Sequence, residues 1–172
     1  MRSASIALAA LACASVFAAA APERASAGTI AQAGAAAPNF SLSLIANGRG
    51  TVALSQLKGR AVYLNFFASW CQPCKAEVPS IAQLSKEYAK RGVVVIGVDE
   101  LEGLDAVRSF VAHFGLPYEI GVDDSGEIGA AYGLRGLPLH VFIDASGKVT
   151  ALHPGEMNAD QIRAALNRIA RK

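Results

Sequence analysis

Residues 64–79 have the sequence LNFFASWCQPCKAEVP, which places Cys71 and Cys74 between two patterned stretches. The apolar run 61–68 before the cysteines is typical of a buried strand, and the apolar spacing over 75–90 after them is helical. The N-terminus of a helix has unpaired N–H groups and the positive end of the helix dipole, and both stabilise a thiolate. The stretch therefore predicts disulfide exchange, in which Cys71, the more accessible thiol, attacks and Cys74 resolves the mixed disulfide.

Other uses of a C-x-x-C pair require partners that the sequence does not supply. A zinc site needs two further ligands, but the third cysteine, Cys13, lies in a predicted leader. The three histidines, which are not at metal-ligand spacing, are His113, His140 and His153. A purely structural disulfide across so short a loop gains little stability. We therefore expect no metal, and no cofactor other than a redox-active Cys71–Cys74 disulfide.

Residues 1–27 have the features of a secretory signal peptide. Arg2 supplies a minimal positive start, residues 6–21 are uncharged and mostly apolar, and Ala25-Ser26-Ala27 is an A-x-A cleavage site. The mature chain would then begin at Gly28. An uncleaved membrane anchor stays open as an alternative, although the apolar run is shorter than the ~20 residues that a membrane span needs.

Export would place the protein in the periplasm or another extracytoplasmic compartment, where a disulfide is the resting state of a cysteine pair unless electrons are supplied. Without the leader the chain has 14 basic and 13 acidic residues, so its charge gives no sign of a nucleic-acid or membrane surface. About 145 mature residues suffice for one domain with an adequate core, and we expect a monomer.

The mature chain predicts a single α/β domain over 38–172. Residues 28–37 are uncharged and rich in Ala and Gly, which predicts a flexible tether before the domain. Two extended stretches, 40–44 and 51–54, are joined by Asn47-Gly48, and both residues of that pair tolerate positive φ. The domain is therefore predicted to begin with a hairpin.

Strand and helix patterns follow one another through the rest of the domain. After the central strand 61–67 and the helix that follows the cysteines, the chain ends in two strands and a helix. This order favours a mixed sheet with helices on both faces. Asn158 and Gln161 form a capping-box pattern at the start of the last helix. The other predicted elements are extended segments over 93–98, 118–122, 140–143 and 148–152, and helices over 104–114 and 127–132.

Three motifs carry a resemblance to a known family: LNFFASWCQPCKAEVP at 64–79, VVVIGVDE at 93–100 and YGLRGLPLHVFIDASGKV at 132–149. With them the chain resembles the TlpA/ResA-like, AhpC/TSA-related class of thioredoxin-fold proteins. These are exported thiol-disulfide oxidoreductases that include the cytochrome c maturation reductases. The resemblance implies a thioredoxin-like three-layer α/β/α fold with a central mixed sheet. It also implies that residues 101–122 hold the βα-type insertion that separates this class from plain thioredoxin.

The resemblance implies roles for residues around the cysteine pair. Cys71 corresponds to the nucleophile and Cys74 to the resolving cysteine. Pro138 matches a cis-proline that faces the pair, where it would offer the backbone of Leu137 for β-like pairing with an extended substrate. From the sequence alone an ordinary trans proline in a turn is favoured, since only about 5–6% of X–Pro bonds in folded proteins are cis.

Trp70 and Pro73 complete the predicted substrate-binding set. Trp70 would shield the rim of the disulfide or contact a partner, and Pro73 lies inside the C-x-x-C motif. Two positions depart from the family pattern. Phe67 stands where tryptophan is frequent, and Leu139 follows the proline where threonine or glutamate is frequent. The second departure bears on the substrate, because that position lies in the implied docking groove.

Glu77 lies one helical turn after Cys74 and resembles a family glutamate placed beneath the disulfide. A partly buried carboxyl group there could exchange protons with Cys74 as the disulfide breaks. A solvated acid in the first turn would only favour the helix. Plain thioredoxins have an aspartate at the position of Asn65, six residues before Cys71. Asn65 cannot take a proton, so Glu77 is predicted to be the proton acceptor.

These expectations combine into an exported disulfide reductase. Reduced Cys71 would attack a client disulfide, with the haem-binding cysteines of apocytochrome c as the first candidate and copper-site cysteines as the second. A membrane electron donor of the CcdA/DsbD type would re-reduce the pair. A peroxiredoxin-like peroxidase is one alternative, although Ala68 stands where that class needs threonine or serine. A copper carrier that uses the two thiolates is another, although Met157 and the histidines are remote in sequence.

Overall fold

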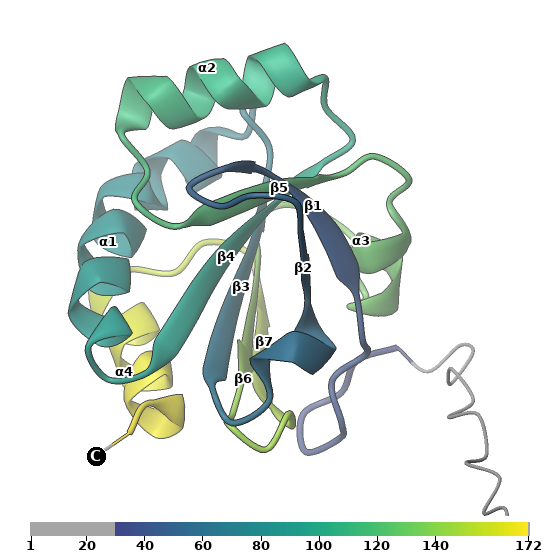
Figure 1. Ribbon diagram of the computed structural model, residues 1–172. Coiled ribbons are helices and arrows are strands. Elements are labelled where there is room, and N and C mark those ends of the chain that lie inside the picture. The colour runs from purple at the N-terminus through teal and green to yellow at the C-terminus, as the bar shows by residue number, and fades with distance from the viewer. Residues whose placement is uncertain (1–29, 172) are drawn as a thin grey trace, which may run out of the picture.

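A seven-stranded mixed sheet forms the centre of the molecule (Figure 1). The structure, a computed structural model, describes residues 30–171, so the predicted signal peptide 1–27 lies outside the described residues. The strands follow the order β2-β1-β5-β4-β3-β6-β7. Between residues 30 and 171 none of the helices has the length and apolarity that a membrane crossing requires.

Every element that the sequence predicts within the described residues is present, with ends within three residues of the predicted ones. The strands are β1 (Ser41–Ala46), β2 (Thr51–Ala53), β3 (Ala61–Phe67), β4 (Val93–Glu100), β5 (Glu119–Asp123), β6 (Leu139–Ile143) and β7 (Val149–Pro154). The helices are η1 (Leu54–Leu57, a 3-10 turn), α1 (Gln72–Ala89), α2 (Leu104–Phe114), α3 (Glu127–Ala131) and α4 (Ala159–Ile169).

Helices cover both faces of the sheet (Figure 1). On one face, α1, α2 and α4 share an apolar cluster with the sheet. On the other face, α3, η1 and the segment before β1 pack around Leu64, Ile96 and Val141. The prediction of a three-layer α/β/α fold with a mixed central sheet is confirmed.

The strand β3 lies at the centre of the sheet and carries the chain to the cysteine pair. All seven of its residues are buried, and they alternate between the faces. Tyr63 and Phe67 belong to the cluster on the α1 side, and Leu64 and Phe66 to the cluster on the α3 side. β3 pairs in parallel with β4 and antiparallel with β6. The carboxyl ends of β3 and β4 and the start of β6 therefore lie at the same end of the sheet.

The predicted hairpin is present as β1 and β2, which pair antiparallel. Positive φ occurs at Asn47 and Gly50 but not at Gly48, which corrects half of the turn prediction. A Cβ at Gly48 would overlap Cδ1 of Leu44 in β1, so that side chain would have to move. The side-chain amide of Asn47 donates to the carbonyls of Leu116 and Tyr118 at 2.7 and 2.8 Å. The turn is therefore tied to the segment before β5.

The prediction of a flexible tether over 28–37 is wrong for the part that the structure describes. The N–H of Gly34 donates to the carbonyl of Val149 at 2.7 Å. Ala36 forms an isolated antiparallel bridge with Lys148. β7 is the edge strand of the sheet, so its outer N–H and C=O groups are open to pairing with an extended chain. Small side chains let this segment lie close to β7, although their composition alone resembles that of a linker.

The insertion predicted over 101–122 consists of α2 and β5. β5 pairs in parallel with β4 and antiparallel with β1, so the insertion joins the hairpin to the central sheet. Gly121 allows this close approach, because a Cβ there would lie 2.5 Å from the carbonyl oxygen of Ser43 in β1. The same strand order places the carboxyl end of β3, which leads to the cysteine pair, near the start of α2.

Candidate active site

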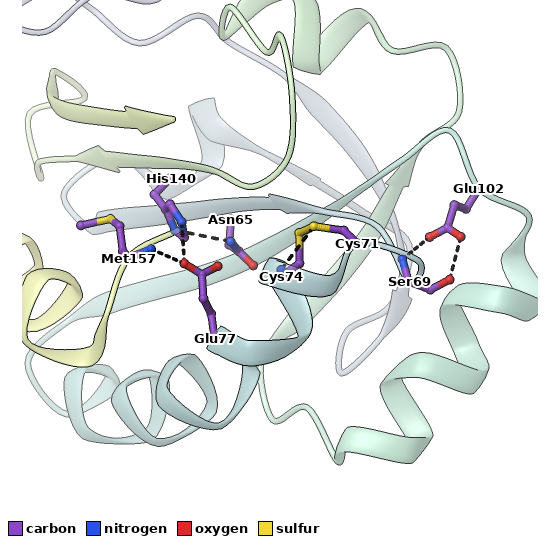
Figure 2. The surroundings of a disulfide bond; sticks show 8 residues. All are labelled: Asn65, Ser69, Cys71, Cys74, Glu77, Glu102, His140 and Met157. Atoms are coloured by element: carbon purple, nitrogen blue, oxygen red, sulfur yellow. Dashed lines mark hydrogen bonds and ion pairs between the residues drawn. A yellow bond between two sulfur atoms is a disulfide. The ribbon is translucent and has the colours of Figure 1, made fainter. Parts of the chain in front are cut away.

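The cysteine pair lies at the first turn of α1 and forms a disulfide (Figure 2). Cys71 is the N-cap of the helix, and its Sγ accepts a hydrogen bond from the N–H of Cys74 at 3.2 Å. The two Cα atoms are 5.3 Å apart. Pro73 sits in the first turn, where no intrahelical N–H bond is lost. The predicted position of the pair at a helix N-terminus, which favours a thiolate, is confirmed.

Both cysteines are buried, whereas the neighbouring Trp70 is exposed. The exposed fraction is 4% for Cys71, 3% for Cys74 and 65% for Trp70. In the disulfide form both cysteines pack in the apolar cluster on the α1 side, and the greater accessibility of Cys71 in the reduced protein stays a prediction. Trp70 therefore offers an apolar surface beside a disulfide that is itself covered.

The register of β6 against β3 brings Pro138 to the cysteine loop. Leu139 pairs with Phe66, so the residues before β6 lie beside the end of β3. The Leu137–Pro138 peptide bond is cis, as the resemblance implies. No hydrogen bond within the described residues involves the N–H or C=O of Leu137, which leaves both groups open to an extended chain. The side chain of Leu139 is buried in the cluster on the α3 side, so it is not part of an exposed groove.

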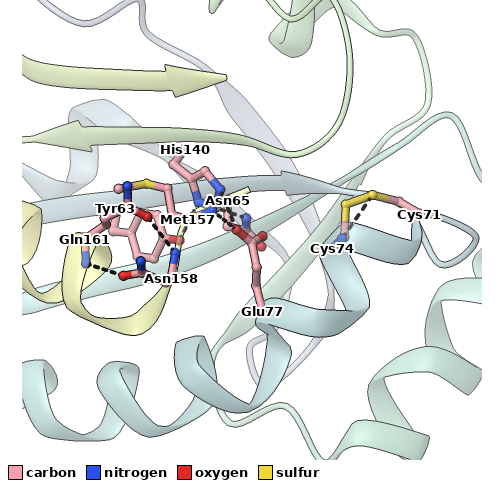
Figure 3. A network of polar contacts seen from close by, with 9 residues as sticks. All are labelled: Tyr63, Asn65, Cys71, Cys74, Glu77, His140, Met157, Asn158 and Gln161. Atoms are coloured by element: carbon pink, nitrogen blue, oxygen red, sulfur yellow. Dashed lines mark hydrogen bonds and ion pairs between the residues drawn. A yellow bond between two sulfur atoms is a disulfide. The ribbon is translucent and has the colours of Figure 1, made fainter. Parts of the chain in front are cut away.

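Glu77 is buried and has two close neighbours. Its Oε1 lies 3.2 Å from Nε2 of His140 and accepts a hydrogen bond from the N–H of Met157. The contact with His140 is close but poorly aligned for a hydrogen bond. Oε2 has no hydrogen-bond partner among the described residues. The burial of Glu77 excludes the alternative of a solvated acid at the helix start, and Figure 3 shows its carboxyl group directed toward His140.

His140 links Glu77 to β3, and the sequence analysis missed it. Its Nδ1 lies 2.8 Å from the hydroxyl of Tyr63 and 3.5 Å from the amide nitrogen of Asn65 (Figure 3). Burial, with smaller repulsion from Tyr118 and Glu77, raises the pKa of Tyr63 well above its ordinary value. One signal was available in the sequence: His140 is the polar residue in an otherwise apolar strand, Leu139–Ile143.

A second polar group lies on the other side of the disulfide (Figure 2). Glu102 accepts hydrogen bonds from the N–H and, at 2.7 Å, the hydroxyl of Ser69. Asp99 is fully buried, and neither of its oxygens has a well-aligned hydrogen bond among the described residues. Burial, followed by the contact with Glu102, raises the pKa of Asp99 to about 8. Burial raises the pKa of Glu102, but the hydrogen bonds from Ser69, together with Asp99 and Lys75, leave that pKa below its usual value.

A further buried acid, Glu100, follows Asp99 in β4. Burial and repulsion from Asp123 raise the pKa of Glu100 to about 7. Asp123 itself accepts a hydrogen bond from the N–H of Gly129 at 2.8 Å. Despite these acids, within residues 30–171 no group of three or more His, Cys, Asp or Glu side chains is arranged to hold a metal ion.

Known proteins with similar sequences are thiol-disulfide oxidoreductases. The chain is 36% identical over 138 residues to the thiol-disulfide oxidoreductase ResA of Bacillus anthracis, and the match covers 80% of this chain and 79% of that protein. It is 35% identical over 136 residues to ResA of Bacillus subtilis (strain 168), with 79% and 75% covered. The redoxin family matches residues 32–168.

Solved structures give the same result. A candidate thiol:disulfide interchange protein DsbE from Chlorobium tepidum matches with a TM-score of 0.71 and 34% identity, over 79% of this chain and 99% of that one. A secreted disulfide oxidoreductase of Mycobacterium tuberculosis, described as homologous to E. coli DsbE, matches with a TM-score of 0.66 and 25% identity, over 75% and 95%. The chain, with its Cys71–Cys74 disulfide, belongs to the redoxin family and is a ResA-like thiol-disulfide oxidoreductase with a thioredoxin-like fold.

Proposed function

We propose that this oxidoreductase works as an exported reductase of disulfides in client proteins. The observation that carries the proposal is the buried carboxyl group of Glu77, one helical turn after Cys74. A carboxylate close to the pair disfavours a second negative charge on Cys74. It thereby favours the disulfide over the dithiolate, and a pair that favours its own disulfide gives electrons to other disulfides.

The exchange takes two steps at the N-terminus of α1. The thiolate of Cys71 attacks one sulfur of the client disulfide, which forms a mixed disulfide and releases the other client sulfur as a thiolate. Cys74 then loses its proton to Glu77 and attacks Sγ of Cys71, which releases the second client sulfur. The client gains two electrons, and the pair loses two electrons as it returns to the disulfide.

An extended client segment would dock beside the disulfide. The open N–H and C=O of Leu137 supply main-chain hydrogen bonds, next to the buried Pro138. The exposed ring of Trp70 and the exposed Pro73 supply apolar contact at the rim. Specificity would come from contacts next to the reacting sulfurs rather than from a deep pocket.

The proposed client and electron donor rest on the resemblance to the family. We propose the haem-binding cysteines of apocytochrome c as the first client and copper-site cysteines as the second, with a membrane donor of the CcdA/DsbD type. Export would depend on residues 1–27, and the protein would act as a periplasmic or otherwise extracytoplasmic monomer. The similarity to a disulfide oxidoreductase of Mycobacterium tuberculosis that is described as secreted supports this placement.

Trapping of the mixed disulfide between Cys71 and a client tests the proposal. In a Cys74→Ser variant the mixed disulfide on Cys71 cannot resolve, so the variant should accumulate covalent adducts with apocytochrome c that a reducing agent releases. The matched Cys71→Ser variant keeps the other thiol and should give none. Adducts that form equally on both variants, or on neither, would contradict the proposed exchange. Adducts that form with Cys71→Ser alone would reverse the roles of the two cysteines.

A further inference from the structure

His140 takes no part in the exchange as described above, yet it lies against the carboxyl group that the exchange uses. The side chain of His140 is 0% exposed and that of Glu77 is 1% exposed. A buried imidazole needs partners for its ring nitrogens, because unpaired polar groups are costly away from water. Tyr63 and Asn65 lie at one ring nitrogen and Glu77 at the other.

The neighbours of Nδ1 determine where the ring proton is. The amide nitrogen of Asn65 can only donate, and it lies 3.5 Å from Nδ1. The hydroxyl of Tyr63 lies 2.8 Å from the same atom, and burial raises the pKa of Tyr63 well above its ordinary value, so this hydroxyl keeps a proton that it can donate to Nδ1. Nδ1 of His140 is therefore the acceptor, and in the neutral ring the proton is on Nε2, which faces Glu77.

The two oxygens of Glu77 consequently differ. Oε1 faces the Nε2–H of His140 and the N–H of Met157. Oε2 has no partner among the described residues, and Figure 2 shows it on the Cys74 side of the carboxyl group. A proton that leaves Cys74 binds more readily to the oxygen without a donor, because Oε1 already faces two N–H groups.

We propose that His140 is a positioning residue for Glu77. His140 holds Oε1 of Glu77, so that Oε2 receives the proton of Cys74. The proposal rests on the proposed function, because it specifies how the mixed disulfide is resolved. The thiol proton of Cys74 moves to Oε2, and the sulfur keeps its electron pair and bonds to Sγ of Cys71. The bond from Cys71 to the client breaks with its electron pair on the client sulfur, which takes a proton from solvent.

Within residues 30–171, three further titratable or charged groups lie on the elements packed near this pair. From β7, the ring of His153 lies 6.2 Å from that of His140, centroid to centroid. From α4, Arg168 lines the same surface hollow as His153. From the segment before β5, Tyr118 acts on Glu77, and burial raises the pKa of this tyrosine above its ordinary value. Both buried tyrosines stay neutral between pH 5 and 9. Asp99 and Glu100, whose pKa values burial raises to about 8 and about 7, also change charge in that range, and we expect them to contribute equally in the parent and in the His140 variants.

The test follows the resolution of a mixed disulfide between Cys71 and glutathione, started with oxidised glutathione, as a function of pH. His140→Phe keeps the aromatic ring but removes the Nε2–H that faces Oε1, so the charged form of the proton acceptor loses a stabilising contact. We expect resolution at pH 7 to slow about tenfold and its pH midpoint to rise by about one unit. His140→Gln places an amide N–H near the position of Nε2 and should restore most of the parent profile. The matched His153→Gln variant should leave the profile unchanged.

A double variant separates positioning from a general packing defect. If His140 acts through Glu77, then His140→Phe should slow resolution no further in a Glu77→Gln background. An equal slowing in both backgrounds, or a parent-like profile for folded His140→Phe, would overturn the proposal. Should His140→Phe fail to fold, ¹⁵N NMR of the parent decides the matter, because a proton on Nδ1 rather than Nε2 contradicts the arrangement.

The same data distinguish the inference from the function on which it rests. A parent protein that reacts neither with oxidised glutathione nor with a protein disulfide contradicts the proposed exchange itself. A parent that reacts and resolves normally, together with His140 variants that match it at every pH, contradicts only the role of His140.

Discussion

Glu77 and Asp99 are buried carboxyl groups near the same disulfide, but they differ in their hydrogen-bond donors. Glu77 faces the N–H of Met157 and Nε2 of His140. Asp99 faces Glu102, and neither of its oxygens has a well-aligned hydrogen bond among the described residues. Two carboxyl groups form a hydrogen bond only when one of them is protonated. With its pKa raised to about 8, Asp99 is the protonated partner at neutral pH.

The raised pKa of Asp99 predicts a pH-dependent change in stability. The folded state releases this proton near pH 8, and the unfolded chain releases it near 4. Between these values the folded state binds more protons, so the free energy of unfolding falls as pH rises, and the loss is complete above about pH 8. Asp99→Asn cannot ionise, so it should be little changed at pH 4 and more stable than the parent at pH 9. Urea unfolding at both pH values measures this.

The control for this prediction is Asp124→Asn, the same substitution at an exposed position. It should shift the free energy of unfolding by the same small amount at every pH. If Asp99→Asn gave a stability difference from the parent that did not grow between pH 4 and 9, Asp99 would already be ionised in the folded protein at neutral pH.

At the level of single residues, the sequence predicts what lies close along the chain. Glu77 could be placed near the disulfide because it follows Cys74 by one helical turn. His140 could not, because its contact with Tyr63 joins residues 77 positions apart and depends on the register of β6 against β3. For a similar reason, the contacts of Glu102 with Asp99 and Ser69 could not be predicted, because they depend on where the neighbouring strands β3 and β4 end.

The start of α4 matters to the site because Met157 directly precedes it. Asn158 is the N-cap: its side chain accepts from the N–H of Gln161 at 3.0 Å, and Gln161 accepts from the N–H of Asn158 at 2.9 Å. This capping box, which the sequence predicts, holds the backbone just before the helix. The N–H of Met157 is thereby kept in place to donate to Glu77.

Removal of this cap should affect both stability and the site. We expect Asn158→Ala to lower the free energy of unfolding by about 1 kcal/mol, because one N–H of the first turn loses its acceptor. The loosened backbone at Met157 should also slow the resolution of the mixed disulfide. Asn158→Ser, which can still cap the helix, should stay within a few tenths of a kcal/mol of the parent. Urea unfolding and the glutathione assay check these effects, and an Ala variant as stable as the Ser variant would contradict them.

Helices and strands were predictable where side-chain patterns are strong. The predicted strand 61–67 and helix 104–114 match β3 and α2 to the residue. The segment 30–37 was mispredicted because Ala and Gly give no pattern, and its order comes from backbone bonds to β7. The sequence of this segment does not show that unpaired N–H and C=O groups are available on the edge strand β7.

For the whole molecule, the strand order brings together three segments that are far apart in sequence. The first turns of α1, the start of β6 and the residue before α4 supply the disulfide, His140 and the N–H of Met157. The three-layer arrangement was predictable from the order of elements and from the family resemblance. The strand register that brings His140 next to Glu77 was not predictable, because it depends on the packing of both sheet faces at once.

The redox state of the disulfide is coupled to the stability of the whole domain. The reduction potential of the folded pair differs from that of the same pair in the unfolded chain by the difference in stability between the oxidised and reduced proteins. Two features act in opposite directions. The N-terminus of α1 stabilises a thiolate on Cys71 and favours the reduced form, whereas burial beside Glu77 disfavours charge on Cys74.

We expect the effect of burial beside Glu77 to be the larger one, so that the oxidised protein is the more stable form, as a reductase requires. Urea unfolding with and without excess dithiothreitol should give a higher free energy of unfolding for the oxidised protein, and each ~1.4 kcal/mol corresponds to ~30 mV in potential. A Cys71→Ser/Cys74→Ser double variant should show no effect of dithiothreitol. Since a protein that oxidises its clients is instead stabilised in its reduced form, greater stability of the reduced protein would assign this chain to disulfide formation.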